Sequence, residues 1–176
     1  MNEKTRKILL SAAAVVLAVI LGLALGKLLG AFKRNDLKDM TASFTVEDEN
    51  GREVELSDFY GKKPIVVNFW AIWCPPCKAE LPDFEKAYKK YGDDVEFIMV
   101  NMLRWQNDTI GDVQAFMSEN GYSFPVYYDV ERSAEEAYAV DSIPLTLFIG
   151  KDGKVKYTYS GTIPQQMLTD YIERLI

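Results

Sequence analysis

Residues 65–82 read IVVNFWAIWCPPCKAELP, and this stretch decides how the rest of the chain is interpreted. Its first part, Ile65–Trp70, is almost continuously apolar, which is typical of a strand buried on both faces of a sheet. A helix is predicted to follow, from about Cys74 to Tyr91. Its inward positions share one face: Cys77, Leu81, Phe84 and Tyr88. The stretch therefore predicts a strand, a turn and a helix, with the chain's only two cysteines at the turn.

Three interpretations of the pair Cys74 and Cys77 compete. A structural disulfide that closes so small a loop adds only about 2 kcal/mol, which is little for a domain with its own core. A structural zinc ion needs four ligands, and the chain offers two thiols. Thiol–disulfide exchange remains, and the spacing favours it.

Exchange chemistry fits the predicted position of the two thiols. Cys74 falls at or near the helix N-cap, where unpaired N–H groups and the helix dipole favour a thiolate. Pro75 and Pro76 fall in the first turn, where a missing N–H costs no hydrogen bond. Cys77 lies one turn deeper, close enough to attack a mixed disulfide on Cys74. We therefore expect an exposed attacking thiol and a sheltered resolving thiol.

Composition excludes several other functions. The chain has no histidine, which removes Ser-His-Asp and Cys-His nucleophiles, His-ligated zinc and covalent haem attachment at a Cys-x-x-Cys-His motif. The net charge is −6, and because residues 1–32 carry +3, the remainder carries −9. A domain this acidic is not expected to bind nucleic acid.

The N-terminal segment predicts a membrane anchor. Residues 8–26 contain no charge and would span about 28 Å as a helix, close to the ~30 Å core of a bilayer. We expect residues 1–7 in the cytoplasm and residues 8–32 as an uncleaved, single-pass signal-anchor in the cell membrane. A signal peptide cleaved after residues 24–26 is the alternative.

The rest of the chain predicts one α/β domain. Residues 33–41 are polar and are expected to form a linker, and residues 42–176 to form the domain. Strands alternate with helices and end in a hairpin and a helix, which indicates a three-layer sandwich around a mixed central sheet. The other expected strands are 44–46, 53–56, 95–100, 124–128, 145–149 and 154–159, and the other helices are 111–120, 133–140 and 164–176.

The run from Asn68 to Pro82, with its Trp-Cys-Pro-Pro-Cys core, resembles the active-site segment of thioredoxin-fold proteins. More narrowly, the chain resembles the TlpA/ResA-like group of membrane-tethered, extracytoplasmic thiol–disulfide oxidoreductases, over about residues 42–176. Ser142-Ile143-Pro144 ahead of a strand adds to the similarity. The resemblance implies a thioredoxin-like sandwich with an N-terminal β-hairpin extension and a central helix–strand insertion.

The resemblance also implies site residues. Cys74 and Cys77 would form the redox-active disulfide, and substrate would contact Trp73, Pro75, Pro76, Ile143 and Pro144. It implies a cis peptide before Pro144 that faces the cysteines; the residues alone favour an ordinary proline at a strand entry. Pro82 lies at the place where thioredoxin-like proteins carry a proline inside this helix, and the alternative is that the helix ends there.

Glu80 is the expected proton partner of Cys77. It lies one helical turn after that thiol, and a partly buried carboxyl there would have a raised pKa. Thioredoxins use an aspartate on the preceding strand, whereas the matching residue here is Asn68, which cannot titrate. The position of Glu80 fits the ResA-like pattern, and the alternative is a solvated helix glutamate.

The sequence also suggests a position for each of the three tryptophans, with weaker evidence than for the cysteines. Trp70 is expected in the core, and Trp73 is expected to shield Cys74. Trp105 is either an exposed rim residue or a filler of a small satellite core; the sequence does not distinguish them.

The sequence therefore predicts a dithiol reductase of protein disulfides outside the cytoplasmic membrane. The resemblance suggests apocytochrome c as a substrate, and sulfoxide reductases, spore-coat proteins or penicillin-binding proteins are equally compatible with these residues. The sequence holds no flavin or nicotinamide site, so no cofactor is expected, and a membrane electron donor of CcdA/DsbD type would re-reduce the pair. Two alternatives stay open: a thiol oxidant of the same fold, and a non-catalytic module that binds apocytochrome, haem or a metal.

Overall fold

The computed structural model describes residues 17, 19–22, 37, 39–41, 43–105 and 108–176. The chain divides into two units, Met1–Leu37 and Lys38–Ile176. In the first unit, residue 17 and residues 19–22 are helical, and the rest of the expected anchor, 8–32, lies outside the described residues. Among the residues that are described, no helix is long and apolar enough to cross a membrane.

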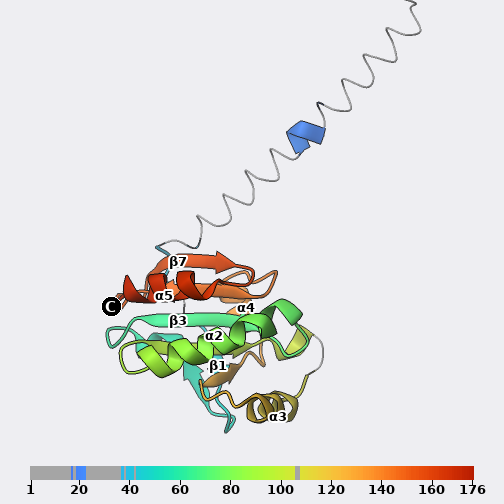
Figure 1. Ribbon diagram of the computed structural model, residues 1–176, viewed down its shortest axis with the longest axis vertical. Coiled ribbons are helices and arrows are strands. Elements are labelled where there is room, and N and C mark those ends of the chain that lie inside the picture. The colour runs from blue at the N-terminus through green and yellow to red at the C-terminus, as the bar shows by residue number, and fades with distance from the viewer. Residues whose placement is uncertain (1–16, 18, 23–36, 38, 42, 106–107) are drawn as a thin grey trace, which may run out of the picture. The chain divides into compact units, whose positions relative to one another are not determined.

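A mixed sheet forms the centre of the second unit (Figure 1), and its strand order is β2-β1-β5-β4-β3-β6-β7. β3, β4 and β5 run parallel to one another, while β6 and β7 on one side, and β1 and β2 on the other, pair antiparallel. The strands are β1 (Thr45–Glu47), β2 (Glu53–Glu55), β3 (Ile65–Trp70), β4 (Glu96–Asn101), β5 (Val126–Tyr128), β6 (Leu145–Ile149) and β7 (Val155–Ser160).

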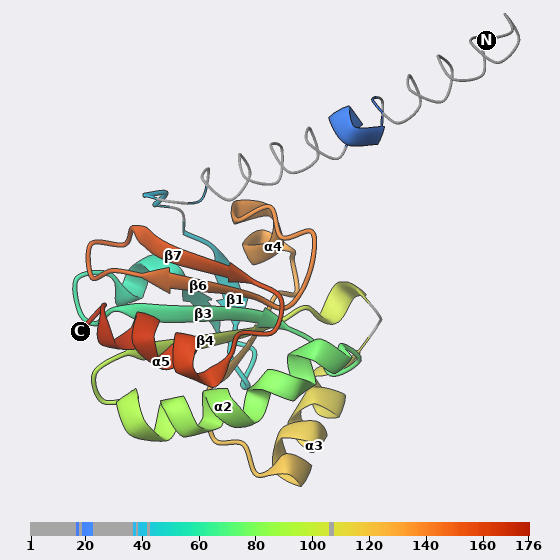
Figure 2. The same ribbon diagram turned by 45° about the horizontal axis from the view of Figure 1, so that its top comes forward.

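Helices cover both faces of this sheet (Figure 2), with α2 and α5 on one face and α4 on the other. The helices are α2 (Pro75–Tyr91), α3 (Ile110–Asn120), α4 (Ser133–Ala137) and α5 (Gln165–Glu173), with 3-10 turns η1 (Leu56–Phe59) and η2 (Leu103–Trp105). The predicted thioredoxin-like sandwich is confirmed. So are its two additions, the hairpin β1–β2 and the insertion made by α3 and β5.

The strand–turn–helix unit that decided the sequence interpretation forms as predicted. Every residue of β3 is buried, because β3 lies between β4 and β6 with helices on either face. Cys74 is the N-cap of α2, and Pro75 and Pro76 occupy its first turn. The helix continues through Pro82, so the alternative that it ends there is wrong.

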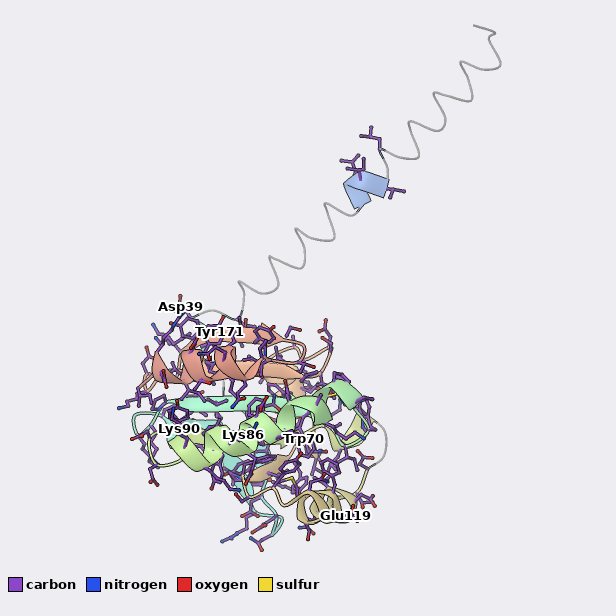
Figure 3. The ribbon with its side chains drawn as sticks, in the orientation of Figure 1. Asp39, Trp70, Lys86, Lys90, Glu119 and Tyr171 are labelled. Carbon is purple, nitrogen blue, oxygen red and sulfur yellow. A yellow bond between two sulfur atoms is a disulfide. The ribbon has the colours of Figure 1, made fainter. Side chains whose placement is uncertain are left out.

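The main core lies between the sheet and α2 with α5. Trp70, which Figure 3 labels, lies at the end of β3 and is fully buried in this core, which confirms the prediction for this residue. Its ring contacts Phe116 of α3, with ring centroids 6.1 Å apart. The core therefore extends to the C-terminal end of β3, directly under the loop that carries the cysteines.

The expected linker, 33–41, reaches into the folded unit at its C-terminal end. The N–H of Asp39 donates to the carbonyl of Val155 (2.9 Å), and the N–H of Val155 donates to the carbonyl of Met40 (3.0 Å). These two bonds attach the chain to the start of the edge strand β7. The folded unit therefore includes residues before 42, where the sequence placed its start.

Gly153 in the β6–β7 turn is expected to be intolerant of a side chain. Its φ is +75°, and a Cβ there would lie 2.9 Å from ring atoms of Tyr60. Gly61 has the same kind of backbone (φ +77°) but no atom within 4 Å of a Cβ. Gly61→Ala should lower the free energy of unfolding by about 1–2 kcal/mol through backbone strain alone. Gly153→Ala should cost about 1–3 kcal/mol more, because the ring must move. Urea unfolding of both variants measures the difference, and equal losses would contradict the assignment.

Candidate active site

A disulfide joins Cys74 to Cys77 at the start of α2, with the two Cα atoms 5.3 Å apart. As the N-cap residue, Cys74 has its Sγ 3.2 Å from the backbone nitrogen of Cys77, whose N–H donates to it. A thiolate at Cys74 would be stabilised by the same N–H and by the positive end of the helix dipole. The local fold therefore provides what the sequence predicted for an attacking thiol.

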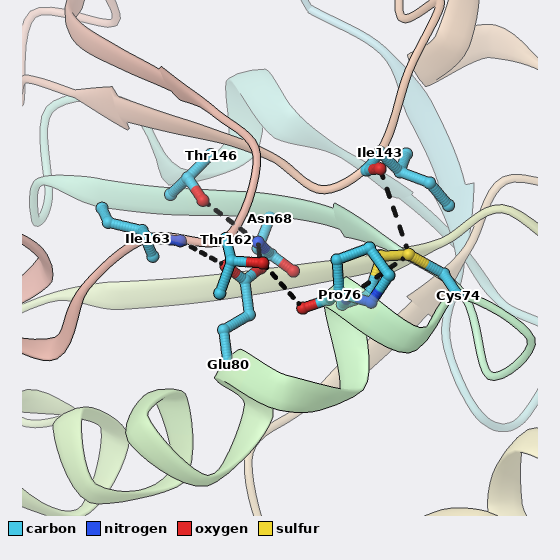
Figure 4. The surroundings of a disulfide bond; sticks show 9 residues. Asn68, Cys74, Pro76, Glu80, Ile143, Thr146, Thr162 and Ile163 are labelled. Atoms are coloured by element: carbon cyan, nitrogen blue, oxygen red, sulfur yellow. Dashed lines mark hydrogen bonds between the residues drawn. A yellow bond between two sulfur atoms is a disulfide. The ribbon is translucent and has the colours of Figure 1, made fainter.

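The exposure of the two sulfurs differs from the prediction. Cys77 is fully buried as expected, but Cys74 is only 3% exposed, so the expected exposed position of Cys74 is wrong for the disulfide form. Its Sγ lies 4.0 Å from the carbonyl oxygen of Ile143 (Figure 4), a van der Waals contact because a disulfide sulfur carries no hydrogen. Pro75 and Pro76 beside it are exposed.

The loop before β6 faces the disulfide. The peptide bond between Ile143 and Pro144 is cis, as the resemblance implied. Pro144 is buried and Ile143 is partly buried, with its carbonyl directed at Cys74. The loop thus brings a backbone segment to the cysteines that an extended polypeptide could pair with. The substrate contacts assigned to these two residues stay predictions.

Glu80 is buried on the inner face of α2. It is 1% exposed, so the alternative of a solvated helix glutamate is wrong. Its carboxylate accepts hydrogen bonds from Nδ2 of Asn68 (2.9 Å) and from the N–H of Ile163 (2.8 Å). Burial raises the pKa of Glu80 to about 7, although both hydrogen bonds act in the opposite direction. A carboxyl with such a pKa can both accept and release a proton near neutral pH.

Three residues around Glu80 escaped sequence analysis (Figure 4). Oγ1 of Thr146 accepts a second hydrogen bond from Asn68 (3.1 Å), and the two residues are paired across β3 and β6. Thr162 donates to the carbonyl of Pro76 (3.1 Å), which ties the β7–α5 loop to the first turn of α2. The third residue, Ile163, acts through its backbone. Thr146 could have been found only by knowing the register, and a backbone donor leaves no signal in the sequence.

The network does not include the cysteines. Among the described residues, the hydrogen bonds of the Glu80 carboxylate go to Asn68 and Ile163 rather than to Cys77. Glu80 and Cys77 lie one turn apart on the buried side of α2. A proton exchange between them is consistent with this placement and stays a prediction.

Asn68 is expected to hold the pKa of Glu80 down. Asn68→Leu removes the hydrogen bond but keeps the site filled and dry, so the pKa of Glu80 should rise by about one pH unit. Thr146→Val is the matched control, because it leaves the Asn68–Glu80 bond in place. Carboxyl resonances of glutamate in ¹³C NMR titrations report both values. An unchanged or lowered pKa in the leucine variant would contradict the assignment.

The same carboxyl should make the oxidised protein less stable as the pH rises. Glu80 has a higher pKa folded than unfolded, so between about pH 4.5 and 7 the folded state binds more protons and stability falls with increasing pH. The loss is on the order of 3 kcal/mol by pH 8. Glu80→Gln lacks this contribution. Urea unfolding of both proteins at several pH values measures it, and a constant difference between them would contradict the raised pKa.

Trp105 lies next to the disulfide loop, and its surroundings combine features of the two interpretations that the sequence left open, an exposed rim residue and a filler of a small core. It is half-buried, and its ring stacks on that of Trp73 with centroids 6.2 Å apart. Its Nε1 donates to Oε2 of Glu135 in α4 (2.8 Å). Trp105 is therefore a fixed rim residue.

Within the described part of the chain, no three His, Cys, Asp or Glu side chains are grouped so that they could hold a metal ion.

A thioredoxin-like sandwich, with a Cys-x-x-Cys disulfide at a helix N-terminus opposite a cis-proline loop, defines a thiol–disulfide oxidoreductase. Comparison with known proteins agrees. The AhpC/TSA family matches residues 37–158. Thiol-disulfide oxidoreductase ResA of Bacillus subtilis (strain 168) is 34% identical over 174 residues, which cover 98% of this chain and 94% of that protein. The chain belongs to the ResA thiol–disulfide oxidoreductases of the AhpC/TSA family.

Other comparisons point the same way. ResA of Halalkalibacterium halodurans is 33% identical over 136 residues, 77% of this chain and 74% of that protein. Among solved structures, StoA from Bacillus subtilis has a TM-score of 0.65 at 25% identity, over 76% of this chain and 98% of that one. The exposed lipoprotein thioredoxin Etrx1 of Streptococcus pneumoniae has a TM-score of 0.66 at 30% identity, over 76% of this chain and 100% of that one. The protein is thus an enzyme of thiol–disulfide exchange.

Proposed function

We propose that this oxidoreductase is a reductase of protein disulfides and that it works outside the cytoplasmic membrane, tethered by residues 8–32. The observation that carries the direction is the burial of both sulfurs, Cys74 and Cys77. Burial penalises a charged thiolate far more than a neutral disulfide. The dithiol form therefore gains little stabilisation from ionisation, and a reduced pair that lacks this stabilisation is the better electron donor.

The proposed reaction has two exchange steps. The Cys74 thiolate attacks one sulfur of the substrate disulfide, forming a mixed disulfide and releasing the first substrate thiolate. Cys77 then loses its proton and attacks Sγ of Cys74, which restores the disulfide seen here and releases the second substrate thiolate. Two electrons pass from the dithiol to the substrate, and two protons end on its thiols.

Glu80 is the proposed base for the second step. Cys77 is buried away from water, so its proton needs an acceptor inside the protein. Asn68 is on the neighbouring strand and carries an amide, which cannot take a proton. Glu80, with a pKa of about 7, can take the proton from Cys77 and return it in the reverse reaction.

The partners rest on resemblance. In the TlpA/ResA-like group the substrate would be apocytochrome c before haem attachment, and a membrane protein of CcdA/DsbD type would return the pair to the dithiol. Trp73, Pro75, Pro76, Ile143 and Pro144 are the proposed substrate contacts. The exposed prolines and the loop facing Cys74 support this assignment, because both border the disulfide.

A thiol oxidant is the second candidate, and one contact favours it. The Cys77 N–H that donates to Sγ of Cys74 would stabilise a thiolate, and thus the reduced form. The two effects oppose each other at the same pair. Burial acts on both sulfurs, whereas the hydrogen bond acts on only one of them. The reductase direction therefore remains the proposal.

Reduction of insulin disulfides separates an enzyme from a binding module. Full-length protein in detergent, with dithiothreitol as the final reductant, should speed the precipitation of the insulin B chain at catalytic amounts. A non-catalytic module would bind a polypeptide without accelerating the reaction. Absence of any acceleration, with the Cys74–Cys77 pair shown to be reducible, would contradict the proposed activity.

A further inference from the structure

Trp105 lies beside the disulfide, and the exchange steps above give it no task. Its ring stacks on Trp73 with an angle of 30° between the planes, and Trp73 directly precedes Cys74. A polypeptide whose disulfide reaches Sγ of Cys74 therefore passes close to this pair of indoles. The residues that flank its cysteine are the ones that the pair can contact.

The indole pair offers a partner little besides its aromatic surface. Nε1 of Trp105 already donates to Glu135, and Nε1 of Trp73 is buried. Neither polar edge is therefore available to a substrate, while both rings remain partly exposed. Aromatic faces attract two kinds of side chain, apolar groups and cations.

The charge of the surrounding surface favours a cation over an apolar group on these rings. Arg132 is engaged by Glu135 through two hydrogen bonds of 2.6 and 3.1 Å, so this neighbouring positive charge is already balanced. Glu136, the residue after Glu135 in α4, is exposed. The residues after 32 carry a net −9. On a surface of this charge, a basic side chain on the ring is favoured over an acidic one.

We propose that Trp105 is a substrate-specificity residue that binds a lysine or arginine side chain flanking the cysteine of the substrate. Glu135 acts as its positioning residue, because it fixes the indole through Nε1 while Arg132 fixes the carboxylate in turn. The inference rests on the proposed function and narrows its substrates to polypeptides with a basic residue beside the disulfide.

The test uses reduced full-length protein and three peptides with one disulfide each, which differ only in the residue flanking the cysteines: lysine, glutamine or phenylalanine. Each rate is divided by the rate with dithiothreitol, which removes the peptide's own reactivity. The lysine peptide should react about fivefold faster than the glutamine peptide, the equivalent of an exposed cation–π pair of about 1 kcal/mol. Trp105→Ala should bring the ratio close to one, and Trp105→Phe should keep part of it.

Three further variants separate specificity from folding. Tyr157→Ala removes a half-buried ring that is likewise stacked, on Tyr171, but lies on β7. It should leave the lysine-to-glutamine ratio unchanged. Glu135→Gln keeps an acceptor for Trp105 but leaves the charge of Arg132 unbalanced, so it should lower the ratio in part, whereas Glu135→Ala also releases the indole and should lower the ratio further.

Equal rates for the lysine and glutamine peptides with the unchanged protein, or a ratio that survives in Trp105→Ala, would overturn the inference while leaving the reductase function standing. A preference for the phenylalanine peptide would overturn the assignment of a basic residue. Failure to reduce any of the three peptides would overturn the proposed function itself, and the inference with it.

Discussion

Replacing Cys77 by serine should stop turnover and leave the protein covalently joined to its substrates. Without the resolving thiol, the mixed disulfide on Cys74 has no internal thiolate to release it, and the reaction halts after the first step. In a single turnover of reduced protein with insulin and no added dithiothreitol, we expect release of the second insulin thiol to fall at least about 1,000-fold, since the exchange loses its second nucleophile. In cells quenched with acid and alkylated, non-reducing gels should show full-length Cys77→Ser in adducts that dithiothreitol dissolves.

Cys74→Ser is the matched control. Cys77 is fully buried, whereas Cys74 lies against the loop of Ile143 at the edge of the core. The serine variant at position 74 should therefore be equally inactive but form few adducts. Adducts in both variants at similar levels would contradict the division into attacking and resolving thiols. Adducts in neither would contradict exchange with proteins.

Glu80→Gln should slow the second exchange step and change its dependence on pH. Reduced protein mixed with 5,5′-dithiobis(2-nitrobenzoate) releases one thionitrobenzoate when Cys74 attacks and a second when Cys77 resolves the mixed disulfide. In the unchanged protein the second rate should rise as the pH passes through about 7, because Glu80 then becomes a carboxylate that can take the proton. Near pH 7 the glutamine variant should be on the order of 100-fold slower in this step. The first release should change little.

Glu85→Gln provides the control on the same helix. Glu85 is also buried, but hydrogen bonds from Lys89 and Ser123 outweigh the effect of burial and lower its pKa. It anchors the α3–β5 connection through the N–H and hydroxyl of Ser123, and among the described residues none of its hydrogen bonds goes to Asn68, Glu80, Thr146 or Ile163. Its replacement should cost stability while keeping the second release and its pH profile. A normal second release in Glu80→Gln, or the same defect in Glu85→Gln, would contradict the proposed proton transfer.

The strand–turn–helix unit was predictable because its local signals agree with one another. A continuously apolar run, two prolines after a cysteine and a helical stripe of apolar residues all place Cys74 at the N-cap, where it lies. The order of strands and helices along the chain was sufficient to predict the three-layer sandwich. Strand ends were less predictable: Phe124 and Pro125 were expected in a strand that begins at Val126, since apolar residues serve equally well in a buried loop.

The residues around Glu80 were less predictable, because they are brought together by the pairing of strands that are far apart in the sequence. Asn68 was singled out because it cannot titrate, yet its role as a donor to Glu80 and Thr146 depends on the register of β3 with β6. The burial of Cys74 was missed for a related reason. Its cover is the Ile143 loop, 69 residues further along the chain.

The redox state of the pair in living cells tests the central claim most directly. Acid quenching, followed by alkylation with a maleimide of known mass, separates the dithiol from the Cys74–Cys77 disulfide on a gel. A reductase supplied with electrons through the membrane should be mostly in the dithiol form during growth, and should shift to the disulfide when its membrane electron donor is deleted. A pair that is mostly oxidised in unperturbed cells would contradict the reductase direction and favour the oxidant.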